Sequence, residues 1–390
     1  MYCLEGRKDE NSMDFSLTEE QVLIRDMARD FASRELAPIA GDLDKEEKFP
    51  EKQLRMMGEL GLMGVNIPEE YGGAEAGSVA TSLAIMEIAS GCASAAVTMS
   101  VTNMVAEVIC SFGTEDQKRK YVPRICSGEY SCAAFGLSET GAGSDPGSMK
   151  TKALKSGDEW ILNGEKLWIS HGDKAGVVIV WARTGGKGTG GISAFLVEQG
   201  TEGFTPGKKE DKMGLRASTT VPLLFEDCRI PADALLGEEN AGFKVAMMAL
   251  DGGRIGIASQ AIGIARAAQC EAVEYAKERQ QFSRPISSFQ AVQWMLADNE
   301  TAISAAESLT LQAAWLKQAK KPFTKQASMA KVFSTEMANE VCAKAVQIHG
   351  GYGYVKEYPV ERHYRDVRVT TIYEGTNQVQ RIVIGRELLK

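Results

Sequence analysis

A carboxylate follows an aromatic residue and precedes a glycine-threonine turn in the segment 372–381, which reads IYEGTNQVQR. If Tyr373 helps to exclude water, the pKa of the Glu374 carboxyl rises and the group becomes a base that works near neutral pH. The turn that follows, Gly375-Thr376, offers backbone N–H groups and a hydroxyl to a phosphate or a carbonyl oxygen. The alternative is that Glu374 simply opens an exposed turn, and this segment alone leaves both interpretations open.

A second segment, 135–145, reads FGLSETGAGSD and combines glycines with small and hydroxyl-bearing residues. Glycines let a backbone approach a flat ring or a phosphate closely. The segment is not a dinucleotide fingerprint, because the third glycine of G-x-G-x-x-G is missing and no parallel strand–helix–strand pattern surrounds it. The alternative is a tight turn that leads into a strand. Further along, Trp168 in the segment 168–170 either stacks on a ring or belongs to the core.

Three segments further along could also contact a ligand. In 250–254, LDGGR, we expect Asp251 in the first turn of a helix on dipole grounds. One turn later, Arg254 either meets an adenine ring or a phosphate, or pairs with Asp251. The segment 279–286, RQQFSRPI, either binds a pyrophosphate or is a helix end carrying cations. The segment 347–353, QIHGGYG, is either a helix ended by glycine or backbone laid against a ligand.

Metal and nucleophile chemistry find no support in the sequence. The three histidines are too far apart for a local metal motif, and no G-x-S-x-G elbow or Walker A loop occurs. The eight cysteines are scattered with no CxxC pair, which indicates reduced thiols, no zinc site and no disulfide framework. The residues concerned are His171, His349 and His363, and Cys3, Cys92, Cys110, Cys126, Cys132, Cys228, Cys270 and Cys342.

The composition is that of an ordinary globular protein of two or three domains, with 390 residues, 44% hydrophobic and 25% charged. A net charge of −8 argues against a nucleic-acid partner. We expect no membrane span, because we find no apolar run that approaches the ~18 residues such a span needs. Residues 1–12 lack the features of a signal or transit peptide, and Met13 is the more natural start, with Thr18 and Gln21 forming a helix capping box. We expect a cytoplasmic protein, or a matrix protein if the chain is a mature mitochondrial one.

Around these segments the pattern of apolar residues changes along the chain from helical to strand-like and back to helical. Helical spacing of apolar residues runs from Thr18 to about Tyr130, with a turn-rich loop at 67–73 and closely packed helices, or the wall of an apolar pocket, at 82–112. Strand-like runs follow at 177–182, 192–198 and 221–225, and we expect 160–170 to be two strands around an Asn163-Gly164 turn. Long helical patterns at 255–278, 289–318 and 324–348 with short connections predict an antiparallel bundle.

Taken together, these segments resemble the acyl-CoA dehydrogenase family of flavoenzymes from about Met13 to Lys390. The resemblance implies an α+β protein with an N-terminal α-helical domain at 13–130, a middle β domain at 131–239 and a C-terminal four-helix bundle at 240–390. It implies FAD as cofactor, and we expect it to be non-covalent because no His or Cys beside these segments demands attachment. It further implies a homotetramer built as a dimer of dimers, in which 279–286 and 347–351 serve a neighbour's flavin.

The resemblance also assigns roles to single positions. It places Glu374 as the catalytic base. Substrate contacts fall on Ser144, Asp251, Arg254, Tyr373, Glu374 and Gly375. Cofactor contacts fall on Phe135, Leu137, Ser138, Gly143, Ser144, Trp168, Ser170, Arg279, Gln281, Phe282, Ile286, Phe289, Gln347, Gly351, Thr376 and Gln378.

The short-chain, butyryl-CoA group is the subgroup that 250–258 and 372–381 most resemble. Branched-chain isovaleryl enzymes place their base at the position of Gly253, where this chain has no carboxylate. The chain departs from the family pattern at Thr140, His171 and Ser283, where Pro, Asn and Gly are usual. These departures bear on fine specificity and leave the family resemblance intact.

The reaction that the resemblance implies is α,β-dehydrogenation of an acyl-CoA thioester, part of fatty acid β-oxidation. Glu374 would remove the α-proton, the flavin would accept the β-hydride, and an electron-transferring flavoprotein would be the acceptor. Alternatives are the same fold acting on a cyclic, branched or dicarboxylic acyl-CoA, an acyl-CoA oxidase, or a CoA-binding module without activity. A dicarboxylic substrate needs a cation deep in the pocket, and the stretch 82–109 contains no Lys or Arg.

Overall fold

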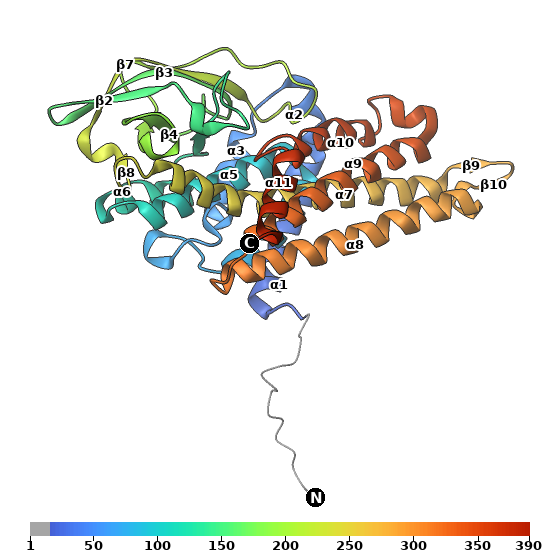
Figure 1. Ribbon diagram of the computed structural model, residues 1–390. Coiled ribbons are helices and arrows are strands. Elements are labelled where there is room, and N and C mark those ends of the chain that lie inside the picture. Colours follow the sequence, from blue (N-terminus) through green and yellow to red (C-terminus); the bar gives the residue numbers. More distant parts are fainter. Residues whose placement is uncertain (1–15) are drawn as a thin grey trace, which may run out of the picture.

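The computed structural model describes residues 16–390 and shows a helical region, a sheet and a second helical region in chain order (Figure 1). The first region begins with the expected capping box, in which the Thr18 hydroxyl accepts from the N–H of Gln21 and the Gln21 side chain accepts from the N–H of Thr18. The expected start at Met13 lies outside the described residues. The helices are α1 (Glu19–Phe31), α2 (Ala40–Glu46), α3 (Glu51–Glu59), α4 (Gly77–Gly91), α5 (Ala93–Phe112) and α6 (Glu115–Cys126).

Helices α4 and α5 form the interior of this first region, because nearly all their residues are buried. The absence of any apolar run of membrane-spanning length was a wrong expectation. Within residues 16–390, α5 is long and apolar enough to cross a membrane, with a mean hydropathy of 1.4 over its best window. In this fold 78% of that window is buried inside the protein, so α5 serves here as a core helix.

The middle region is a sheet whose strands follow the spatial order β6-β7-β3-β2-β4-β5-β8, and β1 pairs with β4 along the edge opposite β5. Pairing is antiparallel except where β1 and β2 meet β4. The strands are β1 (Ala134–Gly136), β2 (Lys152–Ser156), β3 (Glu159–Ser170), β4 (Val177–Arg183), β5 (Ile192–Glu198), β6 (Phe204–Pro206), β7 (Thr220–Pro231) and β8 (Leu235–Leu236).

The expected turn at Asn163-Gly164 is wrong, because β3 is one continuous strand. It pairs with β2 and β7 on its two sides, and the register with β7 shifts between Leu162 and Gly164. Gly164 has a φ of +143°, and a Cβ there would lie 2.7 Å from the Cα of Thr151. The glycine therefore marks a strand irregularity under close backbone packing, where the same dipeptide elsewhere makes a hairpin turn.

The C-terminal region is a bundle in which α7 and α8 pack on α9, and the shorter α10 and α11 also contact α9. Its elements are α7 (Gly242–Glu278), β9 (Gln280–Gln281), β10 (Arg284–Pro285), α8 (Gln290–Gln318), α9 (Thr324–His349), α10 (Val360–Val367) and α11 (Asn377–Leu388). Because α7 starts at Gly242, the expectation that Asp251 lies in a first helical turn is wrong. Gly252 and Gly253 are interior helix residues.

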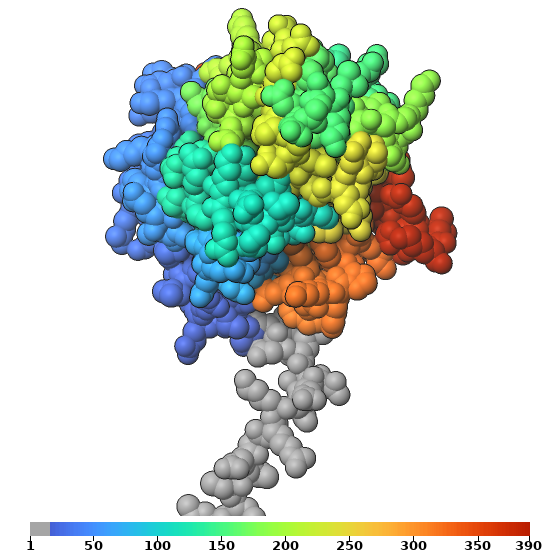
Figure 2. Space-filling view, turned by 90° about the vertical axis from the view of Figure 1, so that its left-hand side faces the viewer, coloured from blue at the N-terminus to red at the C-terminus, as the bar shows by residue number. Residues whose placement is uncertain are grey.

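The three regions are packed into a single body, and their largest cluster of buried residues is common to all three (Figure 2). A large cluster of buried residues runs through α4, α5, α7 and α9 and reaches strands β4 and β5. The predicted order of helical, sheet and helical regions is confirmed. The β9–β10 hairpin lies at the end of the bundle far from the sheet (Figure 1), a separation that matters for the site.

Candidate active site

Glu374 lies on a sharp turn between a 3-10 helix, Arg368–Thr371, and α11. Glu374 and Gly375 both adopt left-handed backbone, with φ of +54° and +84°. A Cβ on Gly375 would lie 2.5 Å from Nε2 of Gln380, which donates to the carbonyl oxygens of Glu374 and Gly375 at 3.1 and 3.0 Å. The turn ends where the Thr376 hydroxyl caps α11 by accepting from the N–H of Val379 at 3.3 Å.

Glu374 is partly buried and one of its carboxylate oxygens points into the protein, which argues against the exposed-turn interpretation. Its Oε2 atom is buried and has no hydrogen-bond partner among residues 16–390. Helix α7 passes directly beside it, since a Cβ on Gly253 would lie 2.6 Å from that Oε2 and 3.0 Å from Sδ of Met104. Glycine at this position therefore leaves the space that the carboxylate occupies.

Asp251 and Arg254 form a buried ion pair on the same helix. Thr324 at the start of α9 donates its hydroxyl to the second carboxylate oxygen of Asp251 at 2.6 Å. Arg254 also reaches the hydroxyl of Ser328 at 3.4 Å. Of the two alternatives left open for Arg254, the internal pair with Asp251 is thus present, and it places a guanidinium near Glu374.

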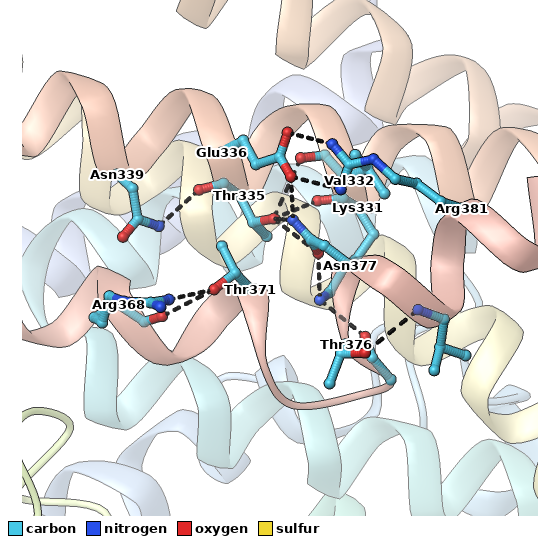
Figure 3. Close-up of polar contacts among 12 residues, drawn as sticks. Lys331, Val332, Thr335, Glu336, Asn339, Arg368, Thr371, Thr376, Asn377 and Arg381 are labelled. Atoms are coloured by element: carbon cyan, nitrogen blue, oxygen red, sulfur yellow. Dashed lines mark hydrogen bonds and ion pairs between the residues drawn. The ribbon is translucent and has the colours of Figure 1, made fainter. Parts of the chain in front are cut away.

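Lys331 of α9 is a second cation near the base, and the sequence reasoning missed it. Its side chain is 0% exposed. The ammonium donates to Oδ1 of Asn377 at 2.8 Å and to the carbonyl oxygen of Gly375 at 3.0 Å (Figure 3). The available signal was helical spacing, because Lys331 shares a stripe of small buried residues with Ala327 and Thr335.

Burial dominates the electrostatics of the base. It raises the pKa of Glu374 to about 7, while the charges of Arg254 and Lys331 oppose that rise. Burial likewise lowers the pKa of Lys331 to about 7, and the Glu374 carboxylate opposes that fall. A carboxyl with such a pKa accepts a proton near neutral pH.

Tyr373 and a small cavity complete the surroundings. The Tyr373 hydroxyl bonds to Oε1 of Gln260 on α7, and burial raises the pKa of the phenol. A cavity of about 30 Å³ extends from Gly253 between α4, α5 and α7. It ends at Lys317 of α8, which pairs with Glu107 of α5 at 2.6 Å. Lys317 could not be found by searching the stretch 82–109, because it comes from a helix two hundred residues away in the chain.

The segment 135–145 lies on the sheet above a buried ion pair. Lys166 of β3, 0% exposed, donates to Oε1 of Glu139 at 2.8 Å and to the carbonyl oxygen of Leu137 at 3.1 Å. Phe135 packs against Trp181 with ring centroids 4.2 Å apart. Ser138 is partly buried, and its carbonyl oxygen accepts from the N–H of Leu167 at 2.9 Å.

The outer part of this segment is open. Gly143 and Ser144 are exposed, and a Cβ on Gly141 or Gly143 would meet nothing within 4 Å. Trp168 is 60% exposed with a φ of +63°, so it is not a core residue. Ser170 is partly buried, and the next residue, His171, is fully buried with Nε2 3.1 Å from the carbonyl oxygen of Ala133.

Most of the remaining candidate cofactor residues gather at the far end of the bundle, whereas Thr376 and Gln378 lie at the start of α11 close to Glu374 in the chain. An open hollow there is lined by residues that include Arg279, Gln281, Ile286 and Gly351. Phe282 at the tip of the hairpin is 88% exposed, and its ring meets the edge of Phe289 with centroids 6.0 Å apart. Gln347 of α9 is exposed, as is Gln378 of α11. Within one chain this hollow lies away from the sheet (Figure 1), so the two sets of residues are not brought together.

Comparisons with known proteins agree with this architecture. Models of three acyl-CoA dehydrogenase domains match in order, the N-terminal domain over residues 18–129, the middle domain over 134–228 and the C-terminal domain over 240–389. The chain belongs to the acyl-CoA dehydrogenase family. It is 52% identical to the mitochondrial short-chain specific acyl-CoA dehydrogenase of Bos taurus over 96% of this chain and 91% of the bovine protein.

Solved structures of the family superimpose closely. Butyryl-CoA dehydrogenase from Megasphaera elsdenii is 46% identical with a TM-score of 0.95, over 97% of this chain and 100% of that chain. A chain in the structure described as the electron transferring flavoprotein of Acidaminococcus fermentans is 48% identical with a TM-score of 0.96, again over 97% and 100%. The expected resemblance to the short-chain group of acyl-CoA dehydrogenases, and the expected oxidoreductase class, are confirmed.

Proposed function

We propose that this acyl-CoA dehydrogenase oxidises a short-chain acyl-CoA thioester to its trans-2-enoyl form, with Glu374 removing the α-proton. The observation that carries this proposal is the Glu374 carboxylate itself. It is turned inward, lies against Gly253 of α7 and has a pKa of about 7. A base with these properties suits an α-proton that the thioester has already acidified.

FAD fits the residues that the fold offers. Backbone around Gly141 and Gly143 is open to close approach, and the indole of Trp168 is free to stack. Arg279, held over the ring of Tyr352, is a suitable partner for a diphosphate. When bound, FAD supplies the acceptor for the β-hydride. Non-covalent binding predicts that denaturation releases the yellow colour from the chain.

The residues of the chain itself bind, orient and move the proton. Asp251 and Arg254 would contact the thioester substrate, and Tyr373 would help to keep water from the base. The backbone N–H of Glu374 is the group that would donate to the thioester oxygen as charge develops on it. Because Gly375 and Gln380 fix the turn, this N–H and the carboxylate move together.

A short acyl chain is favoured by the size of the cavity beyond Gly253, which is about 30 Å³. A dicarboxylic chain finds no free cation there, because Lys317 is paired with Glu107 and Arg254 is paired with Asp251. An oxidase of the same fold would consume oxygen without an added electron acceptor, and a colourless protein that cannot be loaded with FAD would indicate a module without activity.

We further propose a homotetramer, a dimer of dimers, that delivers its electrons to an electron-transferring flavoprotein. The distance between the sheet and the hollow at Arg279 supports this, because a neighbouring subunit could supply the second half of each cofactor site. The relation to the Acidaminococcus fermentans structure supports the acceptor. An active monomer in light scattering at working concentration would contradict the assembly.

The decisive experiment compares Glu374→Gln with Glu387→Gln, a control carboxylate that pairs with Lys390 on the C-terminal helix. Single-turnover bleaching of flavin absorbance by butyryl-CoA is measured. The amide keeps the shape of the site but cannot accept the α-proton, so we expect a loss of about 10²–10⁴-fold in rate, with FAD content and acyl-CoA affinity near wild type. The control should bleach at the wild-type rate. Bleaching of Glu374→Gln within tenfold of wild type would redirect the search to Glu139 and Asp251.

A further inference from the structure

Lys331 is a buried cation without a carboxylate at ion-pair distance in residues 16–390, and the proposed reaction has not yet used it. Its ammonium is held by two neutral oxygens, Oδ1 of Asn377 (Figure 3) and the carbonyl of Gly375. A buried ammonium is costly unless nearby groups compensate its charge. The groups that compensate the charge of Lys331 must therefore lie among its neighbours.

The first contact joins Lys331 to the turn that carries the base. Gly375 follows Glu374 directly, and both residues are in the left-handed region. Such backbone persists only when surrounding contacts hold it in place. Lys331 from α9 and Gln380 from α11 both donate to the Gly375 carbonyl, each at 3.0 Å. Lys331 is thus one of two side chains that hold the Gly375 carbonyl in place, and with it the turn that orients the Glu374 carboxylate.

The second contact belongs to a polar network that fixes the lysine. Asn377 donates to the hydroxyl of Thr335 at 3.0 Å and to Oε1 of Glu336 at 3.1 Å. Glu336 in turn pairs with Arg381 at 2.8 Å (Figure 3). The outer carboxylate is therefore already neutralised by a cation of its own, and Lys331 stays directed at the turn.

The charges around Glu374 come from every element packed against it. Helix α7 contributes Arg254, which Asp251 neutralises as an ion pair. Helix α9 contributes Lys331, and the preceding residue, Tyr373, stays neutral because burial raises its pKa. Farther off, Arg386 of α11 acts on Arg254. Among residues 16–390, Lys331 is thus a cation near the base with no carboxylate at ion-pair distance.

We propose that Lys331 is a positioning residue for the base, which clamps the Glu374-Gly375 turn through the Gly375 carbonyl and favours the ionised carboxylate by its charge. This inference rests on the proposed role of Glu374 as base. The two parts are separable, because a glutamine at position 331 still carries an N–H donor but no charge, whereas a methionine carries neither.

The test titrates Glu374 in full-length protein of Lys331→Gln, Lys331→Met and wild type. The carboxylic acid C=O stretch is followed by infrared spectroscopy, and its absence in Glu374→Gln identifies the band. An opposite charge nearby shifts a carboxyl pKa by roughly 1–3 units. We expect the Glu374 midpoint to rise by about one unit in both variants, since Arg254 remains. The acid limb of flavin reduction by butyryl-CoA should move by the same amount.

The two variants should differ on the alkaline plateau of the rate. Lys331→Gln should retain most of the wild-type rate there, and Lys331→Met should lose roughly tenfold because the turn is less well held. Arg381→Gln breaks the outer ion pair of the same network and should leave both the midpoint and the plateau unchanged. An unchanged midpoint in folded Lys331→Gln, or an equal shift in Arg381→Gln, would overturn the proposal.

Two safeguards keep the result interpretable. If no acyl-CoA reduces the flavin of the wild-type protein, the proposed function fails. The infrared titration of Glu374 still decides the role of Lys331. If neither lysine variant folds, Glu374→Gln gives the reciprocal measurement, because coupling between two sites is equal from both sides. In protein with isotope-labelled lysine, one lysine pKa should then fall below its wild-type value. The absence of any such fall would refute the coupling.

Discussion

At the scale of single residues, the buried charges that serve the chemistry of the site lower the stability of the folded state. Burial raises the pKa of the Glu374 carboxyl and lowers the pKa of the Lys331 ammonium, so that both lie at about 7. Two interacting groups of this kind titrate as a pair, so that the pH profile reports the pair and not either group alone. Charge in such a place weakens the folded state, which is the usual cost of an active site.

The first prediction concerns stability against pH in Glu374→Gln. The folded-state pKa is raised from 4.5 to about 7, so the wild-type carboxyl loses stability as pH rises from its unfolded value through about 7. Below that window the wild type and the variant should differ little. Above it, the amide should be more stable by up to about 3 kcal/mol, from a shift of about 2.5 units. Urea unfolding near pH 5 and near pH 8 measures the difference, and a gain that is larger at the acid end would contradict the assigned direction.

The second prediction concerns the space beside the base. Gly253→Ala would place a methyl group 2.6 Å from Oε2 of Glu374, so the carboxylate must move. Displacement of a catalytic group by about 1 Å can lower a rate by roughly a hundredfold, and we expect kcat to fall by at least tenfold. Gly385→Ala is the matched control, since a Cβ there meets nothing within 4 Å. The control should keep full activity and gain roughly 0.5–1 kcal/mol from the better helix former.

The identity of the base, Glu374, was predictable from the sequence. The charged residues that act on it were only partly predictable. The pairing of Tyr373 with Glu374, and the pair of Asp251 with Arg254, lie within short segments that a reader of the sequence can compare. Lys331 acts on the site only because α9 packs against α11, and Lys317 only because α8 packs against α4 and α7. Which face of each helix turns inward depends on that packing, which short-range spacing does not specify.

At the scale of elements, the segment 135–145 depends on charge buried in the sheet beneath it. Glu139 accepts from the backbone N–H groups of Lys150 and Thr151 at 2.6 and 3.0 Å as well as from Lys166. One carboxylate thereby ties β3 to the strand-free stretch between β1 and β2. The loop has a fixed base and an open rim, an arrangement that suits ligand binding by the rim.

A third prediction follows for this ion pair. Glu139→Gln leaves the Lys166 ammonium buried without a counter-charge, which typically costs about 3–5 kcal/mol. The double variant Glu139→Leu with Lys166→Met removes both charges and should cost less than the single change. Chemical denaturation of all three proteins gives the comparison, together with FAD retained on gel filtration. Equal losses in the single and double variants would show that the pair is not the cause.

A fourth prediction concerns the β9–β10 hairpin. Phe282 and Ser283 both adopt left-handed backbone, with φ of +53° and +62°. A residue with a Cβ is disfavoured there by roughly 1 kcal/mol, which accounts for the glycine usual at the second position in the family. Ser283→Gly should therefore leave Tm unchanged or raise it, while Ser283→Val should lower it. Differential scanning calorimetry distinguishes the two directions.

The element borders show why local sequence signals succeed or fail. Thr18 with Gln21, and Thr114 with Gln117, form capping boxes whose partners lie within one helical turn. The Asn163-Gly164 dipeptide gave a wrong prediction because Gly164 packs against Thr151, the residue directly before strand β2. A signal is reliable when all its partners are near in sequence, and unreliable when a distant strand decides the outcome.

At the scale of the whole molecule, helix α10 joins the three regions. Arg365 bonds to both carboxylate oxygens of Asp44 in α2 at 3.0 and 2.6 Å, and to the carbonyl oxygen of Met213 in the middle region at 3.1 Å. The next residue, Asp366, accepts from the N–H of Leu215 at 2.6 Å. One turn of helix thus fixes the position of the sheet relative to both helical regions, and with it the position of Trp168 relative to Glu374.

The fifth prediction tests this junction. Arg365→Met should lower the free energy of unfolding by roughly 2–3 kcal/mol, because Asp44 loses its partner in a largely buried place. Arg55→Met is the matched control, since its pair with Glu51 is on the surface of α3 and should be worth less than about 0.5 kcal/mol. Urea denaturation provides both values. A similar loss in the two variants would refute a special role for the junction.

The order of regions along the chain was predictable, because each has its own periodicity, whereas their mutual placement was not. That placement depends on contacts such as Arg365 with Asp44, which are more than three hundred residues apart. No periodicity in a single segment carries information of that range.

The membrane-like character of α5 has a consequence for synthesis. This helix leaves the ribosome well before α7, which covers part of it in the finished protein and begins about 130 residues later. At a translation rate of about 5–20 residues per second, the gap lasts roughly 7–25 seconds. During that time the nascent chain carries an apolar helix that α4 and α6 can contact but that α7 does not yet cover. We therefore expect the nascent chain to expose Ala93–Phe112 until the bundle is complete, which makes this helix the expected binding segment for a chaperone at the exit tunnel.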